Sequence, residues 1–566
     1  MSTTSSSAAA RPCVTFSNVS LVHDDGSVTL ADVSGSFGPG RTGLVGANGS
    51  GKSTLLRLAA GLLAPTSGSV VAAGEVAYLP QDVTLDPAST VADLLGVAAT
   101  LASLRAIERG DVAEHHFEVV GDDWDVEARA ADALHPAGLG ADDLERRVAT
   151  LSGGEAMLVA VTGLRLRRAA VTLLDEPTNN LDRAARASLR DLVRSWPGAL
   201  VVVSHDTALL EEMDETAELY AHRLTTHGGP YSSWRAQLET EQAAAAQAAR
   251  TAQQQVRVER RERIEAETTL ARRARQGRAM ARSSRAAPIV LNAWASKAET
   301  HAGRHRQRMD AKVGAARAAA DRAAERVRDD ESVHLELGDP DVPRGRRIAE
   351  LPGPTGAGSV VMRGPERVAL VGANGVGKTT LLELLVRGSV SAEQAAAVRI
   401  DPTRVRLLTD RVGYLPQRSW DLDDEASALA LVSAAAPSVP DRELRNRLAR
   451  LLLRGEAVHR PVRTLSGGER FRVALARLLL ADPPPQLLVL DEPTNDLDLT
   501  TVDQLVSALA AYRGSLLVVS HDDAFLARLG LDRVLELDGS GAMREIDPTE
   551  IHRSAVDPPG RRVTEG

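Results

Sequence analysis

The sequence predicts an α/β fold in which two copies of one domain are joined by a long α-helical hairpin. Two observations lead to this prediction. Five sequence blocks occur twice in the same order, and the segment between the two sets is rich in helix-forming residues and nearly free of glycine and proline. The 566 residues suffice for two large domains, each with a buried core.

The composition is typical of a water-soluble globular protein. Apolar residues make up 43% of the chain, and no run approaches the roughly 20 apolar residues that a membrane-spanning helix needs. The Ser- and Ala-rich start lacks the basic and apolar parts of a secretory signal. A single cysteine, Cys13, excludes a disulfide framework and a thiolate zinc site. We therefore expect a cytoplasmic protein.

The first repeated block is a glycine-rich loop that follows a short apolar run and precedes a helical leucine pattern. Both copies fit G-x-x-x-x-G-K-[ST], in which backbone N–H groups and the start of the next helix face phosphate oxygens. Only four of the 67 basic residues are lysines, and two of them, Lys52 and Lys378, stand at the same place in the two loops. The predicted phosphate-binding residues are Gly46, Asn48, Gly49, Gly51, Lys52, Ser53 and Thr54 in the first copy, and Gly372, Asn374, Gly375, Gly377, Lys378, Thr379 and Thr380 in the second.

Each copy also has an apolar run that ends in two carboxylates, Asp175 with Glu176 and Asp491 with Glu492. Such runs are typical of buried parallel strands that present polar groups at their carboxyl ends. The aspartates can bind Mg²⁺ through water, while the glutamates can orient or deprotonate an attacking water. Helix capping is the alternative role for the glutamates.

Three further blocks bring polar side chains to loops and helix starts. Gln81 and Gln417 follow Tyr-Leu-Pro, and His205 and His521 lie in Ser-His-Asp. The predicted Mg²⁺ ligands are Ser53, Thr379, Asp175, Asp491, Gln81 and Gln417. Leu-Ser-Gly-Gly-Glu predicts two anion-binding helix starts, formed by Ser152, Gly153, Gly154, Ser466, Gly467 and Gly468. Taken alone, these helix starts would be ordinary caps, and the histidines could be satisfied residues at strand ends.

Together these blocks resemble the ATP-binding-cassette superfamily of P-loop NTPases over nearly all of both halves. The glutamines match its Q-loops, Leu-Ser-Gly-Gly-Glu its signature, residues 180–182 and 496–498 its D-loops, and the histidines its switch histidines. The resemblance implies two ATP molecules with Mg²⁺, each held between the glycine-rich loop of one cassette and the signature of the other, and hydrolysis that lets the halves part. The catalytic residues it implies are Glu176, Glu492, His205, His521, Gln81 and Gln417.

The segment between the cassettes predicts a basic helical hairpin over residues 236–331, with a tip near residues 283–292. Residues 250–328 hold 20 Lys and Arg against 8 Asp and Glu, whereas the whole chain has a net charge of −9. If unbroken, a first arm of about 46 residues would reach ~70 Å. Such an appendage suits a polyanion.

The basic residues concentrate toward the predicted tip, where arginine can bind phosphates and stack on exposed bases. The predicted RNA-binding residues are Arg272, Arg273, Arg275, Arg278, Arg282, Arg285, Trp294, Lys297, Arg304, Arg306 and Arg308. Trp294 can instead pack at the bend. The alternative for the whole segment is a solvated coiled coil, which usually intersperses charges along its length.

Tandem cassettes joined by this hairpin are similar to the ABC-F family, and most like its actinobacterial members that protect ribosomes from antibiotics. The resemblance implies a monomeric ATPase whose own cassettes pair and whose linker acts at the tRNA exit site of the ribosome. Its implied partners are the large subunit, ribosomal RNA and tRNA. One competing hypothesis is the ATPase subunit of an exporter with separate membrane proteins. Another is a DNA-repair or chromosome ATPase, although related proteins split the Walker motifs around a much longer coiled coil.

These features predict five regions along the chain: a disordered start at residues 1–11, a first cassette at 12–235, the hairpin at 236–331, a second cassette at 332–539 and a tail at 540–566. The first cassette has 70 residues between Gln81 and Ser152, against 48 in the second copy, so we expect a small arm insertion near residues 101–126.

Two departures from the family pattern concern the nucleotide sites. The family usually stacks adenine on an aromatic residue, but the expected first position is His23, and residues 332–367 contain no Phe, Tyr or Trp. The first signature glutamate is followed by Ala156 and Met157, where the second copy has Arg470 and Phe471. The two sites are therefore expected to turn over differently.

Overall fold

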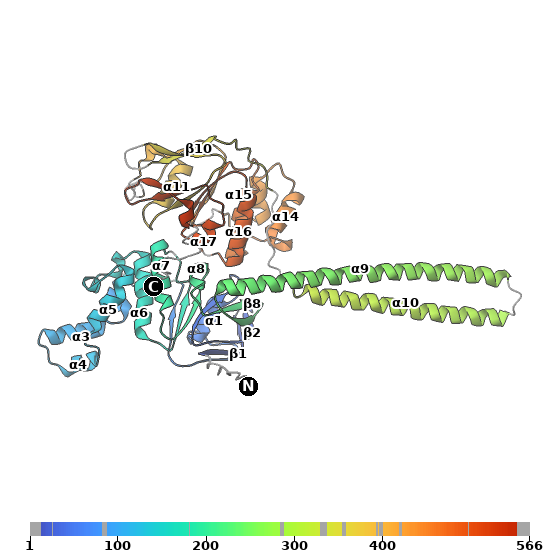
Figure 1. The fold of residues 1–566 in the computed structure, drawn as a ribbon, viewed down its shortest axis with the longest axis horizontal. Coiled ribbons are helices and arrows are strands. Elements are labelled where there is room, and N and C mark those ends of the chain that lie inside the picture. Colours follow the sequence, from blue (N-terminus) through green and yellow to red (C-terminus); the bar gives the residue numbers. More distant parts are fainter. Residues whose placement is uncertain are drawn as a thin grey trace, which may run out of the picture. The chain divides into compact units, whose positions relative to one another are not determined.

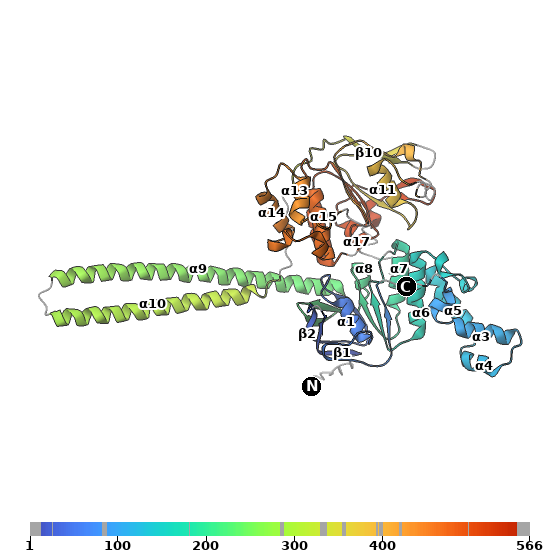
Figure 2. The same ribbon diagram turned by 180° about the vertical axis from the view of Figure 1, so that it is seen from behind.

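The structure is a computed structural model of the chain. It describes residues 13–24, 26–81, 86, 88–179, 181–283, 288–328, 337–353, 358–391, 394, 400–417, 422–495 and 497–551. The chain divides into two compact units, one made of both cassettes and one spanning Ser232–Glu331 (Figures 1 and 2). The predicted fold class is confirmed, because the structure contains two α/β cassettes and a helical hairpin.

The first cassette is built on a six-stranded sheet in the order β5-β6-β7-β3-β8-β9. The strands are β3 (Arg41–Val45), β5 (Val76–Leu79), β6 (Val171–Asp175), β7 (Ala199–Val203), β8 (Glu215–Tyr220) and β9 (Arg223–Gly228). All neighbours pair in parallel except β8 and β9. Every residue of β6 and β7 is buried, which explains why their sequences are continuous apolar runs rather than alternating ones.

A smaller antiparallel sheet completes the first cassette, with β1 (Val14–Val22) between β2 (Val28–Phe37) and β4 (Ser67–Ala72). The helices are α1 (Lys52–Ala59), α2 (Val91–Leu95), α3 (Ala98–Glu108), α4 (Glu114–Val120), α5 (Val126–Leu134), α6 (Gly153–Arg167), α7 (Arg183–Arg194) and α8 (Thr207–Leu210). Helices α3 and α4 occupy the stretch in which we expect the small arm, and they share a small apolar cluster with Val126.

The second cassette repeats this topology. Its sheet has the order β14-β15-β16-β12-β17-β18, again with only the last pair antiparallel. The strands are β12 (Arg367–Val371), β14 (Val412–Leu415), β15 (Leu487–Asp491), β16 (Ser515–Val519), β17 (Arg533–Leu537) and β18 (Met543–Ile546), and the small sheet holds β10 (Arg347–Pro352), β11 (Ser359–Arg363) and β13 (Arg406–Leu407). The helices are α11 (Lys378–Arg387), α13 (Ala428–Ala435), α14 (Asp441–Arg450), α15 (Gly467–Leu479), α16 (Leu499–Ala511) and α17 (Asp523–Ala527).

The hairpin consists of α9 (Tyr231–Ser283) and α10 (Pro288–Ala324), which run side by side (Figures 1 and 2). Helix α9 has 53 residues and begins at Tyr231 rather than at residue 236, because no helix-breaking residue follows Pro230. Helix α10 begins inside the predicted tip, so the break is shorter than residues 283–292. Proline is tolerated at a first helical position, where its missing N–H would have no partner in the helix.

The predicted boundary of the second cassette at residue 539 is wrong. Strand β18 pairs with β17 beyond this point, and Met543 and Ile551 are both buried in the cassette. The polar, glycine-containing sequence at residues 538–541 is typical of the start of a tail, but in the structure it forms a turn that connects two antiparallel strands. Residues 1–11 and 552–566 lie outside the described part of the chain.

The buried position of Met543 gives a test of this boundary. Met543→Ala removes a fully buried side chain that packs against the small sheet and α11, so we expect it to lower the free energy of unfolding by about 2–4 kcal/mol. Thr549→Ala, at an exposed position, is the control. Denaturant unfolding measures both variants, and equal stability of the two would contradict the assignment of β18 to the core.

Candidate nucleotide sites

The glycine-rich loops connect the central strands, β3 and β12, to the helices α1 and α11. Gly46 and Gly372 have φ values of 155° and 149°, and a Cβ atom there would lie 2.6 and 2.4 Å from backbone oxygens of β8 and β17. Only glycine therefore allows the loop to pass this close to the neighbouring strand. Lys52 Nζ donates to Gly46 O at 2.7 Å, and Lys378 Nζ donates to Gly372 O at 2.8 Å. Both ammonium groups thus lie over their loops.

The aspartates lie at the carboxyl ends of β6 and β15. In the first cassette, Ser53 Oγ donates to Asp175 Oδ1 and Tyr78 OH donates to Oδ2, both at 3.1 Å. In the second cassette, burial raises the pKa of Asp491 to about 6, although the Thr379 hydroxyl lowers it. Within the described residues, neither carboxylate oxygen of Asp491 has a hydrogen-bond partner that meets normal geometry.

The glutamates that follow share an unusual backbone conformation. Glu176 and Glu492 have φ values of 50° and 47°, in the left-handed region that non-glycine residues rarely adopt. Strain of this kind at the same place in both copies indicates a functional constraint. His205 Nε2 lies 3.0 Å from Glu176 Oε1, and His521 N donates to Glu492 Oε2 at 3.3 Å. Each glutamate is therefore held beside its histidine.

Burial controls the ionisation of these groups. It lowers the pKa of His205 and of His521 to about 3, so both imidazoles are neutral at pH 7. It also raises the pKa of Glu492 to about 7, against the opposing positive charges of Arg186 and Lys378.

A cavity of about 500 Å³ lies in front of the first glycine-rich loop. The predicted residues that line it are Asn48, Gly49, Gly51, Lys52, Ser53, Thr54, Gln81, Glu176, His205 and Gly467, the last from the second cassette. The second cavity, of about 360 Å³, is lined by Asn374, Gly375, Gly377, Lys378, Thr379, Thr380, Gln417, Asp491, Glu492 and His521. The structure thus brings loop, carboxylate, glutamine and histidine together in both copies.

The signature residues are less evenly placed. Ser152 and Ser466 each cap a helix and accept a hydrogen bond from the glutamate three residues on. Gly467 lines the first cavity, whereas no residue of the first signature lines the second. Gly154 lies beside Leu181, which does line it, since a Cβ on Gly154 would be 3.7 Å from Leu181 Cδ2.

Several cavity residues were not found by sequence analysis. They are Thr29, Asn179 and Val203 in the first cavity, and Arg186, Gln394, Asn495 and Val519 in the second. Asn179 and Asn495 could have been found from their place beside the D-loops. His23, the expected adenine neighbour, is exposed, and its Nε2 lies 2.8 Å from the hydroxyl oxygen of Thr29.

The two cassettes exchange contacts through the aspartates that begin α7 and α16. Asp498 accepts from its own Thr501 N at 2.7 Å with one oxygen, and from Asn48 N of the opposite loop at 2.7 Å with the other. Asp182 repeats this arrangement, but its contact with Asn374 N is longer, at 3.4 Å. Asn180 and Asp496, the other D-loop positions considered, lie outside the described residues.

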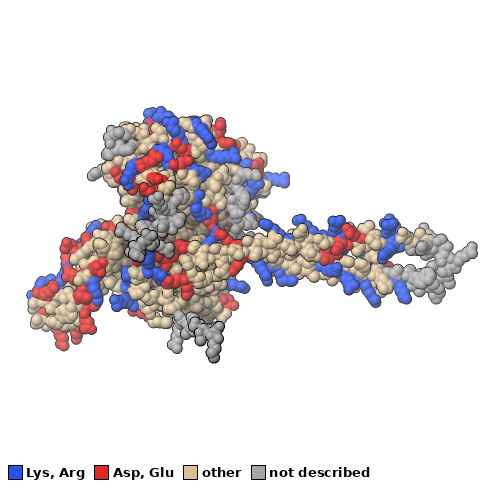
Figure 3. All heavy atoms as spheres, viewed as in Figure 1, with Lys and Arg blue, Asp and Glu red and all other residues tan. Residues whose placement is uncertain are grey.

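The hairpin presents the predicted RNA-binding residues on its surface. Arg272, Arg273, Arg275, Arg278, Lys297, Arg304, Arg306 and Arg308 are all exposed, and Figure 3 shows basic side chains along both helices. None of these eight forms an ion pair with a carboxylate within the described residues. The side chains of Arg282, Arg285 and Trp294 lie outside the described part of the chain.

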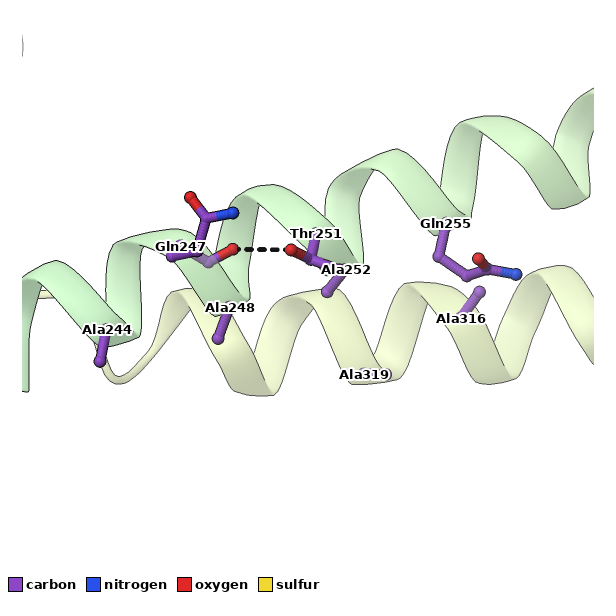
Figure 4. A pocket seen from close by; sticks show the side chains of 8 residues that line it. All are labelled: Ala244, Gln247, Ala248, Thr251, Ala252, Gln255, Ala316 and Ala319. Atoms are coloured by element: carbon purple, nitrogen blue, oxygen red, sulfur yellow. Dashed lines mark hydrogen bonds between the residues drawn. The ribbon is translucent and has the colours of Figure 1, made fainter.

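A groove of about 680 Å³ follows the seam between α9 and α10. Figure 4 shows Ala244, Ala248 and Ala252 of α9 directed toward α10, and Ala316 and Ala319 of α10 line the same groove. Alanine side chains are too short to fill the space between two helices, which explains the hollow. The groove carries no charged side chain, so it offers little for a nucleotide.

Comparison with known proteins agrees with this geometry. A family model described as ABC transporter matches residues 30–179 and 348–495. The chain is 33% identical over 541 residues to the tylosin resistance ATP-binding protein TlrC of Streptomyces fradiae, covering 89% of this chain and 94% of TlrC. It is 32% identical over 515 residues to the ATP-binding protein Uup of Caulobacter vibrioides, covering 89% and 74%.

The fold also resembles that of a solved structure, the archaeal ribosome recycling factor aABCE1 in complex with the ribosomal stalk protein aP1. That likeness has a TM-score of 0.54 at 20% identity, and it covers 93% of this chain and 89% of the other. Two cassettes with these motifs define an ATP-binding and ATP-hydrolysing enzyme. The chain belongs to the ABC-F family of ATP-binding-cassette proteins. None of its helices, as far as they are described, combines the length and apolar character that a bilayer crossing requires.

The unequal aspartate contacts give a prediction. Asp498→Ala and Asp182→Ala each remove a helix N-cap, worth about 1 kcal/mol, but only Asp498→Ala also removes a 2.7 Å contact between cassettes. We expect the ATPase rate to fall about tenfold further in Asp498→Ala, as for loss of a hydrogen bond to a charged group. Steady-state ATPase assays measure this, with thermal unfolding as the control for the caps. Equal losses in the two variants would count against it.

Proposed function

We propose that this ATPase binds the ribosome near the tRNA exit site and that its hairpin protects against ribosome-targeting antibiotics or modulates translation. The observation that carries the proposal is the exposed basic surface of α9 and α10, with eight cationic side chains that have no described carboxylate partner. Such a surface suits the phosphates of ribosomal RNA or tRNA. Similarity to a protein named for tylosin resistance supports the antibiotic role. A ribosomal partner would also place the protein in the cytoplasm.

We further propose that each cavity holds ATP with Mg²⁺. The donors fit a hard cation, because hydroxyl, carboxylate and amide oxygens are its preferred ligands and the buried oxygens of Asp491 have no hydrogen-bond partner of normal geometry in the described residues. The metal would be held by Ser53, Asp175 and Gln81 in one site and by Thr379, Asp491 and Gln417 in the other. When bound, Mg²⁺ neutralises charge on the phosphates.

The roles of the protein groups follow from their positions. The loop N–H groups and Lys52 or Lys378 would bind the phosphates, and Glu176 or Glu492 would orient and deprotonate the attacking water. The opposite signature would complete each site, so two bound ATP molecules would hold the cassettes closed. Hydrolysis would then remove that attraction and let the cassettes part within a single monomer.

The closed state can be tested by removing both glutamates. Glu176→Gln/Glu492→Gln keeps the shape of the sites but lacks the bases, so we expect ATP to accumulate and the protein to co-sediment with ribosomes. The control adds Lys52→Ala/Lys378→Ala, which removes the phosphate-binding ammonium groups and should abolish ATP-dependent binding. If the glutamine variant with ATP sediments free of ribosomes, the proposed function is wrong. Recovery instead with a membrane protein would favour the exporter hypothesis.

The hairpin surface can be tested by charge reversal. Changing Arg272, Arg273, Arg304 and Arg306 to Glu should weaken ribosome binding at least about tenfold. It should also make binding less dependent on salt concentration, because a protein with fewer phosphate contacts releases fewer counterions when it binds. Changing Arg250, Arg257, Arg317 and Arg322 to Glu is the matched control, since these four are also exposed but lie toward the other end of the hairpin. Filter binding to purified ribosomes at several salt concentrations measures both. Equal weakening by the two sets would show that overall charge, and not this surface, binds RNA.

A further inference from the structure

The first cassette contributes an arginine to the second nucleotide cavity. The second cassette has no arginine at the equivalent position to contribute to the first cavity. Arg186 lies on α7, four residues after Asp182, and lines the cavity together with Lys378, Glu492 and His521. The equivalent residue of the second cassette is Val502, which follows Asp498 by the same four residues and is buried in an apolar core. The asymmetry is therefore one of charge within the cavity itself.

The contacts of Arg186 hold its guanidinium between the two sites. The side chain is 14% exposed, and its Nε donates to Leu181 O at 3.2 Å. Its Nη1 donates to Asp206 Oδ2 at 3.4 Å, and Asp206 directly follows His205 of the first site. Its positive charge acts on Glu492, which lines the same cavity.

On the signature helices, it is the second cassette that has an arginine and the first cassette that has an apolar residue. Arg472 on α15 acts electrostatically on Asp498, the residue that contacts the first glycine-rich loop. The equivalent residue on α6 is Leu158, which follows Ser152 as Arg472 follows Ser466 and is buried. Arg186 thus lines the cavity of the opposite cassette, whereas Arg472 acts on Asp498 of its own cassette and is not among the described residues that line the first cavity.

We propose that Arg186 is a positioning residue of the second ATP site, supplied in trans by the first cassette, where it orients Glu492 beside the bound nucleotide. The physical need is clear from the surrounding charges. Asp491 and Glu492 place two carboxylates in a cavity that must also accept a polyanion, and Lys378 is the sole cation that the second cassette contributes to its described lining. A guanidinium in the same cavity as Glu492 offsets this excess, and it is able to donate to a carboxylate in a fixed direction. Through Asp206, it also connects the second site to the histidine loop of the first.

The inference rests on the proposal that this cavity is an ATP site. The ADP formed in the first turnover can be measured for each site separately, in variants that inactivate the other site. In Glu176→Gln the burst of ADP formed on mixing with ATP reports the second site, and in Glu492→Gln it reports the first. Adding Arg186→Val, which installs the residue of the second cassette, should slow the Glu176→Gln burst about tenfold or more, as for loss of one preorganised donor. The Glu492→Gln burst should change less than about twofold.

Two further variants exclude a merely structural effect. Arg183→Ala breaks the 2.6 Å ion pair with Asp523, another contact between the cassettes from the same helix, and should leave both bursts within about twofold. Arg186→Lys keeps the charge and should restore part of the lost rate. Equal slowing of both bursts by Arg186→Val, or no slowing of either, would overturn the inference. Absence of any burst in Glu176→Gln with Arg186 intact would instead show that the second cavity does not hydrolyse ATP, which contradicts the site assignment itself.

Discussion

The paired cassettes depend on one interaction: an aspartate that serves its own helix and the opposite glycine-rich loop at once. Asp498 uses one oxygen to cap α16 and the other to accept from Asn48 N. A carboxylate is suited to this because it can accept several hydrogen bonds, and its charge strengthens each of them. The loop that would bind phosphate is consequently positioned by the other cassette as well as by its own strand.

This dependence gives a physical reason for the duplication. A single cassette contains lysine, carboxylates, glutamine and histidine, but each described cavity is also lined by residues of the other cassette. Gly467 reaches the first cavity from the second cassette, and Arg186 reaches the second cavity from the first. ATP binding can therefore favour the paired state of the cassettes, because only that state presents the full set of residues that line the cavities.

The duplication is not perfect, and one of its departures lies at the sites. Val502 and Leu158 are buried apolar residues where the other cassette has Arg186 and Arg472, and of these two arginines Arg186 lines a described cavity, the second. Two sites with the same catalytic groups and different surrounding charges need not bind or hydrolyse ATP at the same rate. Unequal sites would allow one nucleotide to hold the cassettes together while the other is turned over.

Much of the fold followed from the sequence, because its strongest signals are local. Buried strands such as β6 and β15 are continuous apolar runs, and the glycine-rich loops have a fixed spacing. The end of the second cassette was missed because a polar turn precedes β18, and the start of α10 because proline is ambiguous at a helix start. Arg186 was missed for another reason: its role depends on the opposite cassette, and no pattern within one copy shows which residues cross an interface.

If each ATP is bound by both cassettes, a structure of the Glu176→Gln/Glu492→Gln protein with ATP and Mg²⁺ should contain two nucleotides. Each should contact the glycine-rich loop of one cassette and the signature of the other, with Arg186 facing Glu492. A structure in which each nucleotide touches a single cassette, and the aspartate contacts to the opposite loops are broken, would contradict this arrangement.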